Sequence, residues 1–129
     1  MTKIAISFFL ASSLILAHAQ SAPSLKGKWK IHLSIPSHDS DFYCTFTQSD
    51  QALGGNCATE AGNAKVNGKF DGRNVFWTYT VKVSGQSIIS NYSGMLDASG
   101  KISGGLSVPG MPRIPGTPSQ FPFTATRSQ

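Results

Sequence analysis

Three tight turns, each flanked by segments of alternating apolar and polar residues, constrain the fold of this chain most. The turns are Asp71-Gly72, Ser84-Gly85 and Asp97-Ala98-Ser99-Gly100. Asp-Gly suits the positive φ angles of a type I′ turn, and Gly at the end of a three-residue loop suits the left-handed position of a G1 bulge. The turns therefore predict four successive strands that are joined as antiparallel hairpins.

The register of these hairpins places large side chains on one shared inner face, because alternate residues of a strand point to the same side. The predicted cross-strand pairs are Trp77 with Tyr92, Tyr79 with Ser90, Val81 with Ile88, Gly94 with Gly104 and Leu96 with Ile102. The predicted inner face comprises Val75, Trp77, Tyr79, Val81, Ile88, Tyr92, Ile102 and Leu106.

The two ends of the strand pattern predict a closed sheet. The first strand carries apolar residues at every second position from Trp29 to Ile35 and is followed by a predicted loop over 36–41, and the last strand covers 120–127. Glycine recurs within the predicted strands, where it is normally unfavourable, and the bends of a barrel explain its use there. Pairing of the first and last strands would leave no free edge. We therefore expect an all-β fold, an eight-stranded antiparallel up-and-down barrel.

The first 19 residues have the pattern of a secretory signal peptide. A positive start at Lys3 is followed by an apolar stretch over 4–16 and by the small-x-small sequence Ala17-His18-Ala19. An uncleaved membrane anchor is the alternative, but the apolar run is shorter than the roughly 20 residues of a membrane span. We expect residues 20–129 to form one domain, secreted or periplasmic, with no membrane segment after cleavage.

The two cysteines of the chain are expected to form a disulfide, because exported proteins fold in oxidising compartments. A hairpin that turns at Asp50-Gln51 places Cys44 directly opposite Cys57, and side chains in a non-hydrogen-bonded antiparallel pair are close enough to bridge. Two free buried thiols are the alternative. We expect no catalytic or metal-binding role for either cysteine, and no cofactor.

The formal net charge of +5 comes from basic residues that are mostly dispersed. Lys26, Lys28 and Lys30 form the one cluster, and their spacing places them on one face of the first strand. Such a stripe is typical of a solvated outer face, and an anionic surface or polysaccharide is the alternative partner. Nucleic-acid footprints are normally larger and include exposed aromatic residues, so we expect no nucleic-acid partner.

Short motifs in a fixed order make the chain resemble the avidin and streptavidin family. That family shows G-T-W, L-T-G, L-T-G-R-Y, G-W-T-V, W-S-G and a terminal F-T in this order. The corresponding segments here are Gly27-Lys28-Trp29, Leu53-Gly54-Gly55, Val66 to Phe70, Val75 to Thr78, Tyr92-Ser93-Gly94 and Phe123-Thr124. The resemblance implies an eight-stranded barrel of the calycin type.

The biotin site of that family is not retained at the matching positions. Its polar and indole groups correspond here to Ile31, Cys57, Val81, Leu106 and a position near Phe121. The positions that keep a related group are Trp29, Ser90 in place of Thr, and Tyr92 in place of Trp. Because a buried polar ligand group without a partner costs free energy, we expect the chain not to bind biotin.

The leading functional hypothesis is a non-catalytic binding module that holds a small, largely apolar molecule inside the barrel. Its predicted ligand-binding residues are Trp77, Tyr79, Ser90, Tyr92 and Leu106. The proline-rich segment 109–118 would cover this pocket. The alternative for the same residues is an ordinary packed core, since large inward side chains fill small barrels well.

Two further readings concern residues outside the predicted core. An enzyme would have to use the segment Ser37 to Asp41 together with His32, but a polar hairpin loop needs such residues for turn chemistry alone, so we expect no enzyme. An interaction domain would use Phe76, Ile89 and Met95, which are predicted to point outward and would suit a homo-oligomer. Asn91-Tyr92-Ser93 also matches a glycosylation sequon.

Overall fold

The structure is a computed structural model that describes residues 23–36, 38–110 and 120–128. The predicted signal peptide, and residues 111–118 of the proline-rich segment, lie outside these residues. The elements are nine strands: β1 (Gly27–Ile35), β2 (His38–Ser49), β3 (Ala52–Thr59), β4 (Gly62–Lys65), β5 (Asn67–Phe70), β6 (Asn74–Val83), β7 (Gln86–Leu96), β8 (Ile102–Ser107) and β9 (Phe121–Arg127). Within the described ranges, no helix has the length and apolarity that a membrane crossing requires.

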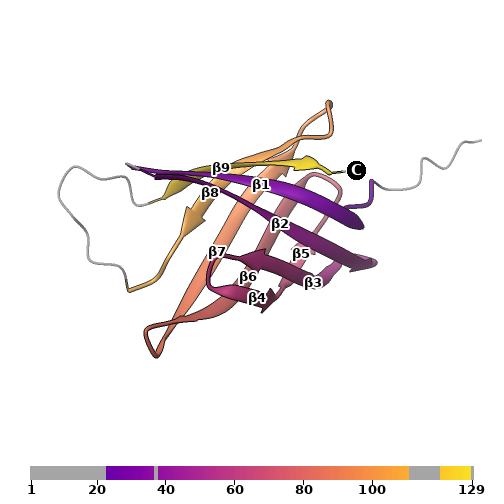
Figure 1. Ribbon diagram of the computed structural model, residues 1–129. Helices are drawn as coiled ribbons and strands as arrows, with labels where there is room; N and C mark the ends of the chain where they lie inside the picture. Colours follow the sequence, from indigo (N-terminus) through magenta and orange to yellow (C-terminus); the bar gives the residue numbers. More distant parts are fainter. Residues whose placement is uncertain (1–22, 37, 111–119, 129) are drawn as a thin grey trace, which may run out of the picture.

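Eight of the strands form a closed antiparallel ring (Figure 1). Around the ring, the order is β2, β1, β9, β8, β7, β6, β5 and β3, and the pairing of β3 with β2 closes it. The first and last strands pair, with Ile31 opposite Ala125, so neither of these two strands leaves a free edge. The predicted eight-stranded up-and-down barrel is confirmed.

The ninth strand is β4, which is separated from β5 at Val66. Both β4 and β5 pair with β3 in the same register, and the Val66 N–H donates to the Gly55 carbonyl across the break at 2.8 Å. Gly55 has a φ of 117°, a conformation that a side chain would strain. The unchanged register on both sides of Val66 means that the break inserts no extra residue into the ladder.

The predicted registers are all present. The five cross-strand pairs of the hairpins occur as expected, and Cys44 lies opposite Cys57 with a Cα–Cα distance of 4.0 Å and a disulfide between them. At the Gly94–Gly104 pair, the two strands approach so closely that a Cβ atom on Gly104 would overlap the Ser93 carbonyl oxygen. Glycine is required there by the close approach of β7 and β8.

Two local predictions are wrong. Asp71 does not have a positive φ, and the turn spans Asp71 to Asn74, because the Asp71 carboxylate accepts hydrogen bonds from the Arg73 N–H at 3.0 Å and the Asn74 N–H at 2.7 Å. The predicted loop over 36–41 is shorter than expected, because the ladder between β1 and β2 continues to the pair of Ile35 and His38. The Ser84-Gly85 turn does have positive φ at both residues, and Gly100 has a φ of 85°.

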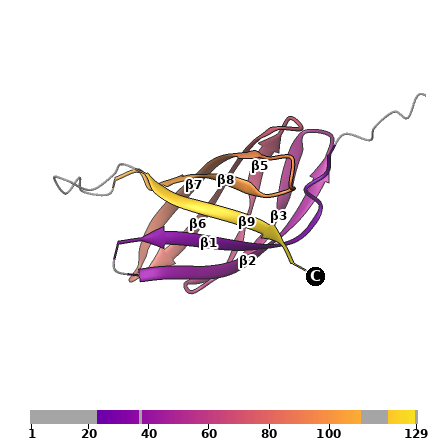
Figure 2. The same cartoon turned by 90° about the horizontal axis from the view of Figure 1, so that it is seen from above.

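One end of the barrel is sealed by residues near the two ends of the domain. The Trp29 indole N–H donates to the Leu25 carbonyl at 2.8 Å, and the Leu25 N–H donates to the Gln48 side chain at 2.8 Å. The Arg127 guanidinium lies over the Trp29 ring at 4.7 Å. Figure 2 shows the described C-terminus at this end of the barrel.

Candidate functional site

The mouth of the barrel is defined here as the end opposite Leu25. At this end β1, β3, β6 and β8 end and β2, β4, β7 and β9 begin, because paired strands are antiparallel. Inward-facing apolar side chains at the mouth are half-buried, whereas most inward side chains deeper in the barrel are buried. The half-buried residues are Ile35, Val81, Ile88, Val108 and Phe121.

A layer of nearly buried residues lies directly below this rim. Tyr79, Ser90 and Leu106 keep 6%, 7% and 5% of their surface exposed, whereas Trp77 and Tyr92 keep 0% and 1%. Exposure therefore falls from the rim towards the centre of the barrel. Three of the five predicted ligand-binding residues form the floor of the mouth, and the other two lie beneath it.

The polar atoms of the floor are hydroxyl groups. The Tyr79 and Tyr92 hydroxyl oxygens are 2.7 Å apart, and Ser90 is the cross-strand partner of Tyr79. In the tyrosine pair, one O–H donates to the other oxygen, and the Ser90 hydroxyl also interacts with Tyr79. Burial raises the pKa of Tyr79, partly offset by the hydroxyls of Tyr92 and Ser90. Burial also raises the pKa of Tyr92, and Tyr79 adds to that shift. The floor is neutral at physiological pH.

Aromatic rings fill the barrel below the floor. Trp77 stacks on Tyr92 with ring centres 4.8 Å apart and an interplanar angle of 8°. The edges of Phe46 and Phe123 contact Trp77, each at 5.2 Å between ring centres. The Trp77 indole N–H is buried without a hydrogen-bond partner, a cost that the stacking contacts offset. Trp77 therefore supports the floor and is covered by Tyr92.

The sequence prediction of the site missed Phe42. Its ring meets the edges of Tyr79 and Tyr92 with ring centres 6.4 Å and 6.3 Å away. The signal was present, since Phe42, Cys44 and Phe46 occupy every second position of β2. The expected alternation points all three inward.

The histidine and aspartate residues near the β1–β2 connection lie on the outer surface. His32 Nδ1 is 2.5 Å from Asp41 Oδ1, and Lys30 Nζ is 3.8 Å from Asp41 Oδ2. The hydrogen bond from His32 is the main cause that lowers the pKa of the Asp41 carboxyl. His38 Nε2 lies 3.7 Å from Glu60 Oε1 in a separate exposed pair. Among the described residues, no three His, Cys, Asp or Glu side chains are grouped to hold a metal ion.

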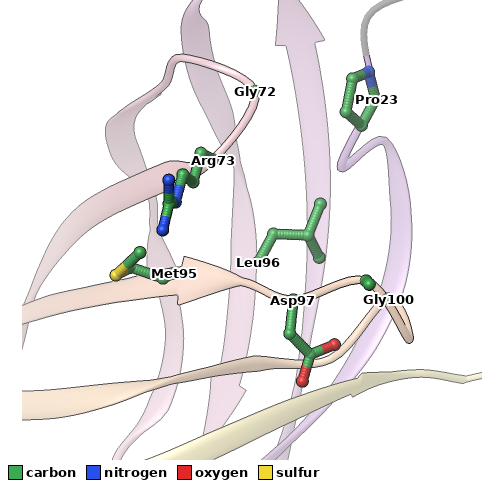
Figure 3. Close-up of a pocket in the computed structure, with 8 residues that line it drawn as sticks. Pro23, Gly72, Arg73, Met95, Leu96, Asp97 and Gly100 are labelled. Atoms are coloured by element: carbon green, nitrogen blue, oxygen red, sulfur yellow. The ribbon is translucent and has the colours of Figure 1, made fainter.

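A surface hollow lies at the sealed end, between the β5–β6 turn and the β7–β8 loop (Figure 3). Residues that line it include Pro23, Arg73, Leu96 and Asp97. The Asp97 carboxylate already accepts hydrogen bonds from the Ser99 and Lys101 N–H groups. The hydrogen-bonding capacity of the Asp97 carboxylate is therefore largely satisfied within the loop. The mouth is the better candidate site.

Comparison with known proteins adds no assignment to this geometry. No protein-family model matches the chain. No curated protein matches it significantly. The resemblance to the avidin and streptavidin family stays a prediction from the sequence motifs.

Proposed function

We propose that this protein is a non-catalytic binding module that holds a small, largely apolar, uncharged molecule in the mouth of its barrel. The observation that carries the proposal is the gradient of exposure from the apolar rim to the floor formed by Tyr79, Ser90 and Leu106. Ligand pockets are mostly apolar and contain a few polar groups that fix orientation. The floor hydroxyls provide such groups.

The chemistry of the interior selects against charged ligands. Ser90 is the only non-aromatic polar residue that is buried in the part of the chain that the structure describes. An ionised ligand group at the floor would lose its hydration and would gain no countercharge, which is unfavourable by several kcal/mol. A neutral molecule with one hydrogen-bond acceptor would instead accept a hydrogen bond from one of the hydroxyls of Tyr79, Ser90 and Tyr92.

The depth of the site is limited by the aromatic rings beneath it. The stack of Trp77 on Tyr92, with Phe46 and Phe123 at its edges, occupies the centre of the barrel. The proposed ligand is therefore held in a shallow site between the rim and this stack. The half-buried rim residues Val81, Ile88 and Phe121 would contact its sides.

The proposal is tested with two fluorescent probes that share an apolar ring system but differ in charge. Neutral N-phenyl-1-naphthylamine should bind with enhanced emission, whereas the anion 8-anilinonaphthalene-1-sulfonate should bind at least about tenfold more weakly, because of the desolvation cost. Biotin should not displace the neutral probe. Failure of the neutral probe to bind a folded barrel would overturn the proposal.

Two substitutions on the same strand provide a matched comparison. Ser90→Phe fills the floor and should abolish binding of the neutral probe, while Ser87→Phe, at an exposed outward position, should leave it unchanged. Circular dichroism checks that each variant is folded. If Ser90→Phe does not fold, Val81→Trp narrows the rim instead and should weaken binding. Equal binding by the native protein and both site variants would contradict a site in the mouth.

The aromatic filling of the centre favours one alternative, an interaction domain with a packed barrel. Seven ring pairs link Phe42, Phe46, Trp77, Tyr79, Tyr92 and Phe123. Such a core stabilises a scaffold whether or not a ligand binds. Absence of probe binding, together with a native fold, is the outcome that would favour this alternative.

We further propose that the protein is exported. The disulfide between Cys44 and Cys57 is compatible with an oxidising compartment, since stable disulfides are rare in reducing ones. This supports the signal peptide that the sequence pattern over residues 1–19 predicts.

A further inference from the structure

Lysine side chains gather on the outside of β1, β2, β3 and β4, which are neighbours in the sheet (Figure 1). Two consecutive rows of paired residues cross these strands, and every residue in the rows is exposed. The first row is Lys28, Thr45, Asn56 and Lys65, and the second row is Lys30, Tyr43, Ala58 and Asn63. These eight residues are called the lysine face here. The fold brings Lys65, which is distant in sequence, to the same surface as the lysines of β1.

The charge of the lysine face is positive throughout, because neither row contains a carboxylate. Within the described residues, Lys28 and Lys65 form no ion pair, whereas Lys30 Nζ lies 3.8 Å from Asp41 Oδ2. Along these four strands, the adjacent carboxylates are Asp41 and Glu60 on the side of the mouth and Asp50 in the β2–β3 turn. The lysine face is therefore a cationic band with an acidic border towards the mouth.

An exposed aromatic ring lies within this band. Tyr43 keeps 40% of its surface exposed, and the Lys28 ammonium lies over its ring at 4.7 Å from the centre. This cation–π contact restricts the lysine side chain, so a partner has less side-chain entropy to remove on binding. On the β3 side, Tyr43 faces Ala58, whose side chain is too small to cover the ring. Tyr43 therefore orients one cation and still presents its ring and hydroxyl to a partner.

Neutral hydrogen-bonding groups lie between the outer cations of the first row. Lys28 and Lys65 are three strand spacings apart, about 14 Å along the sheet. Thr45 and Asn56 lie between them, and each of these side chains can both donate and accept a hydrogen bond. This alternation of cations with hydroxyl and amide groups matches a chain of hydroxylated units that carries acidic groups at intervals.

We propose that the lysine face binds an acidic polysaccharide, which lies along the two rows and crosses β1 to β4. Charge complementarity selects the acidic polymer, since the rows contain cations and no carboxylate. The acidic border at Asp41 and Glu60 would repel a polymer that continued towards the mouth. It therefore directs the polymer across the strands.

Two other anionic partners fit these residues less well. Binding to a membrane surface uses large apolar side chains that enter the lipid boundary, and Tyr43 is the only large ring in the two rows. Single-stranded nucleic acids are bound by several aromatic rings on which successive bases stack. The hydroxyl and amide groups of the first row instead suit the hydroxyl groups of a sugar chain.

The lysine face and the proposed ligand site are independent, because the rows lie outside the barrel wall and the floor residues point into it. Ser90→Phe should therefore leave polysaccharide binding unchanged. Loss of binding of N-phenyl-1-naphthylamine would not affect this proposal, and loss of polysaccharide binding would not affect the mouth.

Isothermal titration calorimetry of the mature protein with polygalacturonate, at about 20 mM salt, tests the proposal. Fully methyl-esterified polygalacturonate has the same backbone without the charges and should not bind. Lys28→Glu and Lys65→Glu should each weaken binding by about tenfold or more, because they place like charges against the polymer. Lys82→Glu is the matched control, since it makes the same change in net charge at an exposed position of β6. It should weaken binding by less than about threefold.

Asp41→Asn tests the direction of the charge effect. Removal of this carboxylate releases Lys30 from its ion pair and should strengthen binding by about twofold or more. If Lys28→Glu does not fold, Lys28→Gln removes the cation without introducing a negative charge and should also weaken binding.

Three outcomes would overturn the proposal. The first is that neither polygalacturonate nor heparin, which provides sulfate groups as well, binds to the folded protein. The second is that Lys82→Glu weakens binding as strongly as Lys28→Glu, because binding would then follow net charge alone. The third is tighter binding to phosphatidylserine vesicles or to a single-stranded DNA oligonucleotide than to either polysaccharide, which would assign the lysine face to a membrane or a nucleic acid.

Discussion

The paired hydroxyls of Tyr79 and Tyr92 show how single residues make a polar floor tolerable inside an apolar barrel. A buried hydroxyl without a partner would be unfavourable by about 1 to 3 kcal/mol, and here each tyrosine provides the partner of the other at 2.7 Å. The rings also contribute packing, since Tyr92 stacks on Trp77. The pair therefore adds hydrogen-bonding capacity to the floor without disrupting the core.

Alkaline titration tests this pair. Burial raises the pKa of Tyr79 and Tyr92 above the ordinary value of 10.0. Their contribution to stability is therefore complete below pH 10 and is lost as the pH rises above that value. We expect both hydroxyls to stay protonated while the barrel is folded. Tyrosinate absorbance of the native protein up to about pH 11 should have the same amplitude in the wild type and in Tyr79→Phe/Tyr92→Phe. A smaller amplitude in the variant would show that the buried pair ionises in the folded state.

At the scale of elements, turn residues predict which strands form a hairpin more reliably than they predict the backbone conformation of the turn. Ser84-Gly85 adopts positive φ at both positions, as a two-residue hairpin loop requires. Asp71-Gly72 has an equally suitable sequence but forms a longer turn, because the Asp71 carboxylate binds the N–H groups that follow it. Local sequence does not decide between these two uses of an aspartate.

The β7–β8 loop provides a test of this side-chain chemistry. The Asp97 carboxylate accepts hydrogen bonds from the Ser99 hydroxyl at 2.6 Å and from the N–H groups of Ser99 and Lys101. The bond from the Ser99 side chain and that from the Lys101 N–H lower the pKa of Asp97 below its ordinary value of 3.8. A lowered pKa stabilises the fold above pH 3.8, and this contribution is lost as the pH falls through the folded pKa.

Asp97→Asn should therefore lower the melting temperature near pH 6, and the difference from the wild type should shrink as the pH falls through the lowered pKa of the native carboxyl. Thermal unfolding followed by circular dichroism at several pH values measures the difference. The low-pH measurement controls for effects of the substitution that do not depend on the charge of Asp97. A difference that stays constant across this pH range would mean that the charge of Asp97 does not stabilise the loop.

For the whole molecule, alternation and hairpin register predicted the inner face and the cross-strand pairs, because both depend on residues that are close in sequence. Closure of the ring, which pairs the distant strands β1 and β9, was inferred instead from the glycines within the predicted strands. Contacts between distant strands were harder to predict. The rings of Phe46, Trp77 and Phe123 meet only because β2, β6 and β9 curve around the same axis. The break at Val66 also depends on barrel curvature, which no local pattern in the sequence encodes. The depth of the candidate site follows from these distant contacts and could not be predicted.

The disulfide provides a test of how much one covalent link contributes to this closed ring. Cys44 and Cys57 are 13 residues apart and fully buried between β2 and β3. A loop of this length restricts the unfolded chain and should stabilise the fold by about 3 kcal/mol. Reduction should therefore lower the melting temperature by about 10 °C or more, since 1 kcal/mol corresponds to roughly 4 to 8 °C in a small domain.

The two strands that the disulfide joins are also held by their own ladder and by neighbours on both sides, so the reduced protein should keep its strand content at room temperature. Cys44→Ala/Cys57→Ala is the control, because its melting temperature should not respond to reductant. Mass analysis of the native protein should show two hydrogen atoms fewer than after reduction. Two thiols that alkylate freely in the native protein would contradict the link. The cross-strand pairing of these residues would then need a separate test, because the backbone register does not require the bond.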